Sequence, residues 1–210
     1  MNGHCRLSAA AGMLFFIGTA GAATIYSNFG PGNAYSTTGF YAVSGSASPD
    51  GAVTFAMAFT PSGTFTLTQI DVAITHSSGT NSVSLTLNLD GFGLPGAVLE
   101  TWSLSSLPAI AACCTVETVT PVGSIVLYPG AQYWLVASAI ASDTIDAWAV
   151  NTTGAIGPVA ENLGSGFVMT SGTLGAFDVL GTVGAAVPEP STVLLTAGGL
   201  ALLWLRRLRR

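Results

Sequence analysis

Ser82-Val83-Ser84-Leu85-Thr86-Leu87-Asn88-Leu89 is a stretch in which every second residue is apolar. Strict alternation is typical of a β-strand that buries one face and exposes the other. The valine and the leucines are therefore expected to face a core, and the polar residues to face outward. No window with helical periodicity occurs outside the two termini of the chain, so this stretch indicates an all-β body.

A second strand carries an irregularity. Phe65 and Leu67 alternate with polar residues, but the apolar phase then shifts by one residue to Ile70, Val72 and Ile74. A shift of one residue predicts a β-bulge near Gln69. Further strands are predicted over residues 35–43, 53–60, 98–104, 116–122, 133–139, 147–150, 166–170 and 176–180.

Turn sequences separate the predicted strands, for example Pro49-Asp50-Gly51 and Ser78-Gly79-Thr80. Many short strands at this spacing are typical of a β-sandwich. We expect residues 24–184 to form one all-β ectodomain, a β-sandwich that is jelly-roll-like.

The charges are distributed unevenly. The chain has no lysine, and its five arginines are Arg6 and the C-terminal Arg206, Arg207, Arg209 and Arg210. The body between the termini contains only acidic charges: Asp50, Asp71, Asp90, Glu100, Glu117, Asp143, Asp146, Glu161 and Asp178. Nucleic-acid binding requires cations that meet phosphate, so it is excluded as a function of this body. Stability must come from apolar burial and backbone hydrogen bonds.

Candidate catalytic residues are few. His76 is the body's only histidine and precedes Ser77 and Ser78, which reads as a loop histidine rather than as part of a Ser-His-Asp triad. One histidine and two cysteines give too few ligands for a typical zinc site. A glycosidase needs two facing carboxylates, and the spacing of the nine acids selects no pair. We expect no enzyme, no catalytic residue, no metal and no cofactor.

Two groups of residues fit a binding role as well as a structural one. Asp143 and Asp146 would suit calcium together with backbone carbonyls, although a solvated loop is the simpler explanation. Trp102, Trp134 and Trp148 would suit a sugar-stacking platform, although tryptophans in sandwich strands usually fill the core.

Cys113 and Cys114 are adjacent and are the only cysteines of the body. An exported protein meets an oxidising compartment, which favours disulfides. We expect a vicinal disulfide; intermolecular bridges and free thiols are the alternatives.

The N-terminus has the organisation of a secretory signal peptide over residues 1–23. Arg6 precedes an apolar run that contains Leu14-Phe15-Phe16-Ile17, and small residues follow at 19–23. Cleavage by signal peptidase is predicted after Ala23, with Ala22 as the alternative.

The C-terminus, residues 185–210, contains a proline-flanked acid, an apolar run and a basic end. Ser191 to Leu205 is a run of fifteen uncharged residues, shorter than the ~20 of a usual membrane helix, which arginine stems can extend by snorkelling. The arginines after it place that end in the cytoplasm by the positive-inside rule. Pro188-Glu189-Pro190 is extended because both prolines restrict the backbone.

This order of features resembles the PEP-CTERM sorting signal of Gram-negative bacteria. The resemblance implies that Pro188, Glu189, Pro190, Arg206, Arg207, Arg209 and Arg210 form the sorting signal. It also implies a transmembrane helix and processing by an exosortase in the inner membrane. A plain C-terminal anchor that no enzyme cleaves is the alternative.

Several body segments resemble the choice-of-anchor R domains of bacterial surface proteins. The segments are Tyr26-Ser27-Asn28-Phe29, Asp90-Gly91-Phe92-Gly93-Leu94-Pro95-Gly96 with Val98-Leu99-Glu100, and Tyr133-Trp134-Leu135 followed by Trp148, Asn151 and Gly154. The family has no established activity, so the resemblance implies no catalytic residue.

These features together predict a secreted, non-enzymatic surface or extracellular-matrix protein, anchored in the inner membrane as a precursor and then exposed at the cell surface or outside it. Extracellular polysaccharide is a candidate partner. The alternatives are a carbohydrate-binding module of the exopolysaccharide layer and a hydrolase acting on surface glycans.

The charge distribution predicts how the processed body responds to salt. Because it has neither lysine nor arginine, added salt mainly screens repulsion among sparse acids. The melting temperature is expected to change little between low and high salt, as differential scanning calorimetry would show. A steep fall with salt would mean that attractive ion pairs hold the fold.

Overall fold

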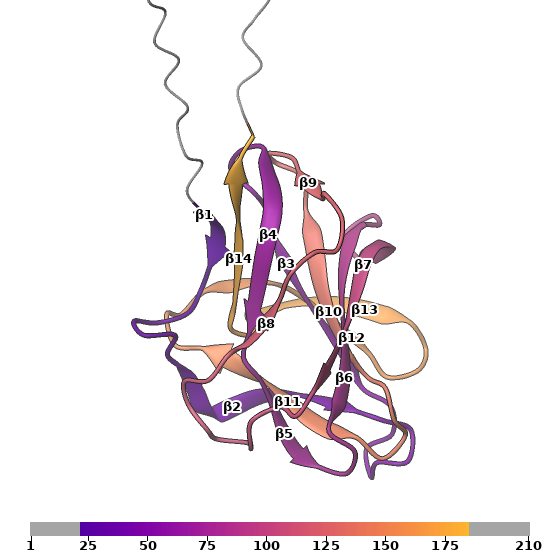
Figure 1. Cartoon of the computed structure of the whole chain (residues 1–210). Coiled ribbons are helices and arrows are strands. Elements are labelled where there is room, and N and C mark those ends of the chain that lie inside the picture. Colours follow the sequence, from indigo (N-terminus) through magenta and orange to yellow (C-terminus); the bar gives the residue numbers. More distant parts are fainter. Residues whose placement is uncertain (1–21, 185–210) are drawn as a thin grey trace, which may run out of the picture.

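The structure is a computed structural model that describes residues 22–184 (Figure 1). This part is all-β, with antiparallel sheets and no helix between residues 22 and 184. The five-stranded sheet has the order β1 (Ala23–Ser27), β14 (Phe177–Val183), β4 (Phe65–Val72) and β8 (Glu117–Val119), and β9 (Val126–Leu127) also pairs with β4. The six-stranded sheet has the order β13 (Phe167–Thr173), β12 (Ile156–Asn162), β3 (Thr54–Phe59), β10 (Tyr133–Ala139), β6 (Ser82–Asp90) and β7 (Pro95–Ser105). The three-stranded sheet has the order β2 (Tyr35–Ser44), β11 (Ile145–Asn151) and β5 (Ile74–Ser78).

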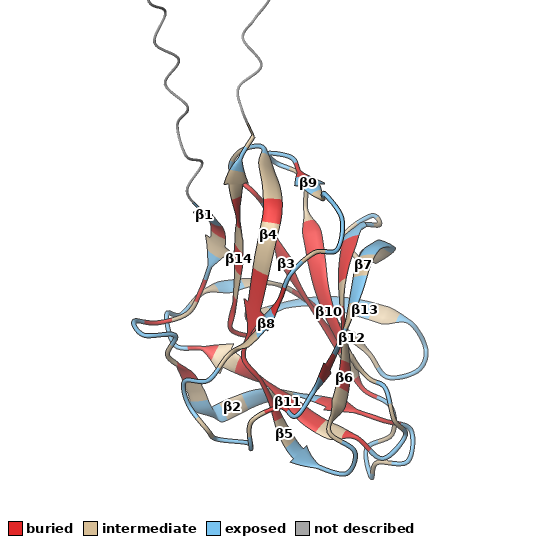
Figure 2. Cartoon of the chain, in the orientation of Figure 1, coloured by how far each residue is buried: buried red, intermediate tan, exposed pale blue. Residues whose placement is uncertain are grey.

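The alternating stretch forms β6, and its pattern predicted the buried face as far as Leu87. Beyond Leu87 the prediction was wrong, since Asn88 is buried and Leu89 is 41% exposed where the pairing with β7 shifts register. Val83, Leu85 and Leu87 are fully buried. They belong to the main core, to which all three sheets contribute, for example Ile70 of β4 and Trp148 of β11. Figure 2 shows that strands of all three sheets contain buried residues. The arrangement is sandwich-like because a single core fills the space that the sheets enclose.

The six-stranded sheet is also covered on part of its opposite face. A second apolar cluster consists of Ala56, Ala58, Trp134, Val136 and Ala160, and Leu94 and Phe167 pack against it. Trp134 is fully buried there, although its neighbour Leu135 faces the main core. β10 is therefore buried on both faces, so it cannot show a simple alternation of apolar and polar residues.

The predicted bulge is present in β4. Gln69 pairs with Leu180 of β14, but Leu67 pairs with Gly181, so Thr68 is the extra residue. This confirms the irregularity near Gln69. It also explains the shift in apolar phase, since one extra residue reverses the faces on which the following side chains lie.

Some strands were not predicted. β12 was missed because Pro158 lies within it, and proline normally argues against a strand. Pro158 pairs with Ser171 of β13 and lies just outside the pairing of β12 with β3, which begins at Val159. β1 and β9 were also missed, and the strand expected over 116–122 is shorter, Glu117–Val119.

The first and last residues of the described part lie at the same end of the sandwich. β1 and β14 pair directly, with Ala23 opposite Gly181, so both ends of the body leave side by side (Figure 1). Most of the predicted signal peptide and the whole sorting signal, Pro188 to Arg210, lie outside the described residues. Among the residues described, no helix is long and apolar enough to cross a membrane.

Gly79 provides a test of how tightly the β5–β6 turn is built. Its φ is +78°, and a Cβ there would lie 1.8 Å from the carbonyl oxygen of Asp143. Gly79→Ala should lower the free energy of unfolding by at least about 2 kcal/mol, because it adds a backbone clash to the strain of positive φ.

Gly51→Ala is the matched control for Gly79→Ala. Gly51 has a similar φ of +74° but no atom near its Cβ position. This variant should cost only about 1 kcal/mol. Equal losses in urea titrations of the two variants would contradict the close approach of Gly79 to Asp143.

Candidate functional site

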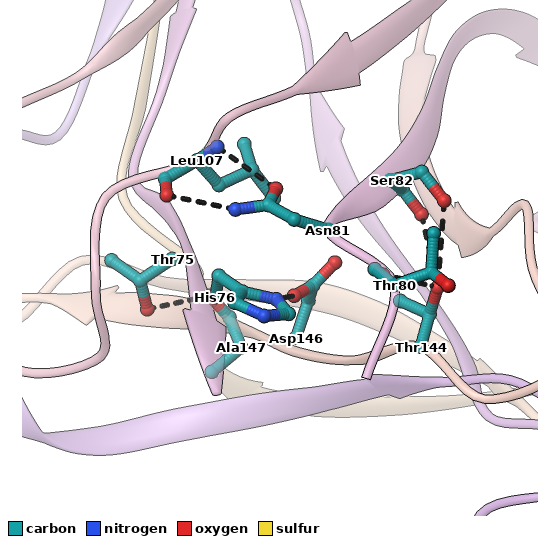
Figure 3. Close-up of polar contacts among 9 residues, drawn as sticks. All are labelled: Thr75, His76, Thr80, Asn81, Ser82, Leu107, Thr144, Asp146 and Ala147. Carbon is teal, nitrogen blue, oxygen red and sulfur yellow. Dashed lines mark hydrogen bonds and ion pairs between the residues drawn. The ribbon is translucent and has the colours of Figure 1, made fainter. Parts of the chain in front are cut away.

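His76 and Asp146 form the only ion pair between residues 22 and 184, and it joins two neighbouring strands. They are direct cross-strand partners in β5 and β11. Their Nδ1 and Oδ1 atoms are 2.6 Å apart (Figure 3). The sequence interpretation of His76 as a loop histidine was wrong, because β5 continues through Ser78.

The backbone of His76 is fixed by the segment that follows β7. Its N–H donates to the Pro108 carbonyl at 2.7 Å, and its carbonyl accepts from Ile110 at 2.7 Å. Asn81 holds the same segment by bonding both the N–H and the carbonyl of Leu107 (Figure 3). The imidazole is therefore held in place by both its backbone and its buried partner.

Asp146 is a buried carboxylate without lysine or arginine nearby. Its side chain is fully buried, and its Oδ2 atom has no hydrogen-bond partner among the described residues. Burial raises the pKa of this carboxyl, while the hydrogen bond and charge of His76 and the Ser77 N–H offset part of that rise. Asp146 can thus orient the His76 ring through the Nδ1–Oδ1 contact.

An acid beside a histidine is one part of a hydrolytic triad. The missing part is a nucleophile, and no described hydroxyl is hydrogen-bonded to the His76 ring. The nearest hydroxyl network in Figure 3 is separate: Thr144 bonds the carbonyls of Thr80 and Ser82. The geometry therefore supports a structural pair better than a catalytic one.

The residues considered for calcium do not assemble a cation site. Asp146 lies in β11 and bonds His76, which corrects the interpretation of it as a solvated loop residue. Asp143 lies in the preceding turn. Within residues 22–184, no three His, Cys, Asp or Glu side chains converge as metal ligands would.

The three tryptophans do not form a common platform. Trp134 and Trp148 are fully buried and donate hydrogen bonds to Asp90 Oδ1 and the Ala176 carbonyl. Trp102 is partly buried against the main core and bonds the Thr120 carbonyl. Stacking of a sugar on all three is therefore excluded.

The structure joins Cys113 and Cys114 by a disulfide. Tyr35 lies against this loop, and its hydroxyl shares its one proton between the carbonyls of Ala112 and Thr115. The disulfide loop is thereby attached to β2. Both cysteines are exposed, so the disulfide itself fills no part of the core.

Asp71 and Asp178 form a carboxylate pair that the sequence spacing did not single out. They are directly opposite each other in β4 and β14. Asp71 accepts hydrogen bonds from Gln69 and Thr118. Burial raises the pKa of Asp178, a hydrogen bond from Ser27 lowers it in part, and the charge of Asp71 raises it further. Asp71 is buried and already occupied by its hydrogen bonds, so the pair suits a structural role better than the acid and nucleophile of a glycosidase.

A hollow of about 290 Å³ opens between the β2–β3 and β10–β11 connections. We call it the hydroxyl hollow, because it is lined by the hydroxyl residues Ser44, Ser46, Thr54, Ser138 and Ser142, by Gly45, Ala52, Ala139, Ala141 and Ile140, and by no charged residue. The two connections approach closely at Gly45, where a Cβ would lie 2.2 Å from the Ala141 carbonyl oxygen. The hollow can therefore offer several neutral hydrogen-bonding groups to a small polar ligand.

Comparison with known proteins identifies no relative: no family model and no curated protein matches the chain. The function must therefore be inferred from the residues and their arrangement.

The buried carboxylates predict the direction of the pH dependence. Asp146, Asp178 and Glu117 all have a raised pKa, mainly through burial. A carboxyl whose pKa is raised in the folded state binds its proton more tightly there than in the unfolded state, so protonation stabilises the fold. The stabilisation is complete below the unfolded pKa of about 4 and is lost as the pH rises through the folded pKa.

His76→Ala removes the partner of the buried Asp146 carboxylate. It should cost about 3 kcal/mol in the free energy of unfolding at pH 7. The cost should be smaller at pH 4, where protonation relieves the buried charge. Urea titrations of wild type, His76→Ala and His76→Ala/Asp146→Asn at both pH values would test this; a cost independent of pH would contradict it.

Proposed function

We propose that this chain is a secreted, non-enzymatic surface or extracellular-matrix protein. In this proposal, signal peptidase removes residues 1–23, an exosortase processes the tail at the inner membrane, and residues 24–184 form a jelly-roll-like β-sandwich that functions outside the cell. The observation that carries the proposal is the order Pro188-Glu189-Pro190, short apolar run and arginine cluster.

The arrangement of the body supports this proposal. Its two ends lie side by side in β1 and β14, so leader and tail would both attach at one pole. The loop between β10 and β11 lies toward the other end of the body (Figure 1). A body attached through its tail would therefore present this end away from the membrane.

A second candidate function is a carbohydrate-binding module, and the hydroxyl hollow favours it. A neutral, hydroxyl-lined concavity suits a ligand that both donates and accepts hydrogen bonds. Because Trp134 and Trp148 are buried, such binding would depend on hydrogen bonds rather than on a tryptophan platform.

Mass spectrometry of the protein from its own host would test the processing. The mature chain should end near Pro190 and contain no residues from 200–210, because cleavage is expected at the extended segment. Replacing Pro188, Glu189 and Pro190 with alanine should leave the tail attached. An intact Arg210 terminus in the wild-type protein of cells with an active exosortase would contradict the sorting function.

A further inference from the structure

A row of polar side chains crosses the outward face of the six-stranded sheet. Its members are cross-strand partners: Asn162 lies opposite Thr54, Ser138 opposite Ser84, and Ser84 opposite Ser103. Ser138 follows Ala137, which pairs with Phe55 of β3, so Ser138 lies next to Thr54, and both line the hydroxyl hollow. We call Asn162, Thr54, Ser138, Ser84 and Ser103 the polar row; it spans β12, β3, β10, β6 and β7.

The hydroxyls of this row are free to bind a ligand. The side-chain oxygens of Thr54, Ser138, Ser84 and Ser103 form no hydrogen bond with another residue in the described part of the chain. All four side chains are partly or fully exposed. Thr86 and Thr101 lie two residues along β6 and β7 and are opposite each other. The Thr86 hydroxyl donates to Asn88 Oδ1, so it can offer a ligand only its acceptor lone pairs.

The polar row itself carries no charge, although the body is acidic. On the same side of the sheet, the next cross-strand row consists of Met169, Ala160, Ala56, Val136, Thr86 and Thr101. The nearest acid along β6 is Asp90, which is occupied by hydrogen bonds from Trp134, Gln132 and Gly93. A neutral partner can therefore approach without desolvating a charge.

The polar row continues into the hydroxyl hollow. Thr54 and Ser138 belong to both, and Ser46 and Ser142 extend the hydroxyl surface beyond the end of the sheet. Neighbouring strands are about 4.8 Å apart, a spacing similar to the length of one sugar residue in an extended chain. A polysaccharide lying across the strands could thus place successive residues over successive hydroxyls.

We propose that the polar row and the hydroxyl hollow bind a neutral polysaccharide chain. This inference rests on the proposed function, since it names the component of the extracellular layer that the body would contact. Anionic polymers are disfavoured because the body carries nine acids and no lysine or arginine. A second copy of the chain is a poorer fit, because the exposed part of the row offers small polar groups rather than large apolar anchors.

Isothermal titration calorimetry of the full chain in detergent would test the proposal with four probes. Cellohexaose, maltohexaose and dextran are neutral, and oligomeric alginate is the anionic comparison. At least one neutral probe should bind saturably and alginate should not. Ser84→Ala/Ser103→Ala/Ser138→Ala should weaken binding roughly tenfold or more, because it removes several hydrogen bonds.

Ser62→Ala/Ser78→Ala/Ser124→Ala is the matched control, since these serines are exposed and lie outside the polar row. The control should bind as the wild type does. The site is wrong if the two triple variants bind equally, if none of the neutral probes binds, or if sedimentation shows a dimer that the row variant dissociates. Because the unprocessed chain is used, these results are independent of whether the tail is cleaved.

Discussion

The absence of lysine and arginine between residues 24 and 184 is the constraint on which the polar interior depends. Buried polar groups must be satisfied by amides, hydroxyls and backbone. Asn28 bonds the Gly175 carbonyl and the Phe177 N–H, and thereby links the segment after β1 to β14. Asn151 similarly bonds the carbonyls of Ala155 and Leu174. Asp146 is the exception, a buried carboxylate that relies on the single histidine of the body.

The six-stranded sheet links the polar interior to the proposed function. At one end of its outward face, Trp134 is covered and bonded to Asp90, so the aromatic surface is used for folding. At the other end, short hydroxyl side chains remain accessible and continue into the hydroxyl hollow. The proposed ligand surface is thus the part of the sheet that the second apolar cluster leaves uncovered.

The candidate sites could be predicted only in part. His76 was singled out because it is the only histidine of the body, but its partner lies seventy residues away in β11. Asp71 and Asp178 are further apart in sequence and meet only because β4 pairs with β14. The polar row has the same origin, since its members come from five strands and depend on register. Pairing of distant strands leaves no signal in local spacing, which is why none of these arrangements was visible beforehand.

The sequence by itself determined the all-β class, the strand β6 and the bulge in β4, because side-chain alternation and its interruption are local properties. It also determined the charge of the body and the motifs that predict its export. Only the tertiary structure decided the strand order, the two-sided burial of β10, the partner of His76 and the polar row. These features depend on which strands become neighbours, and that choice is made by the packing of the whole core.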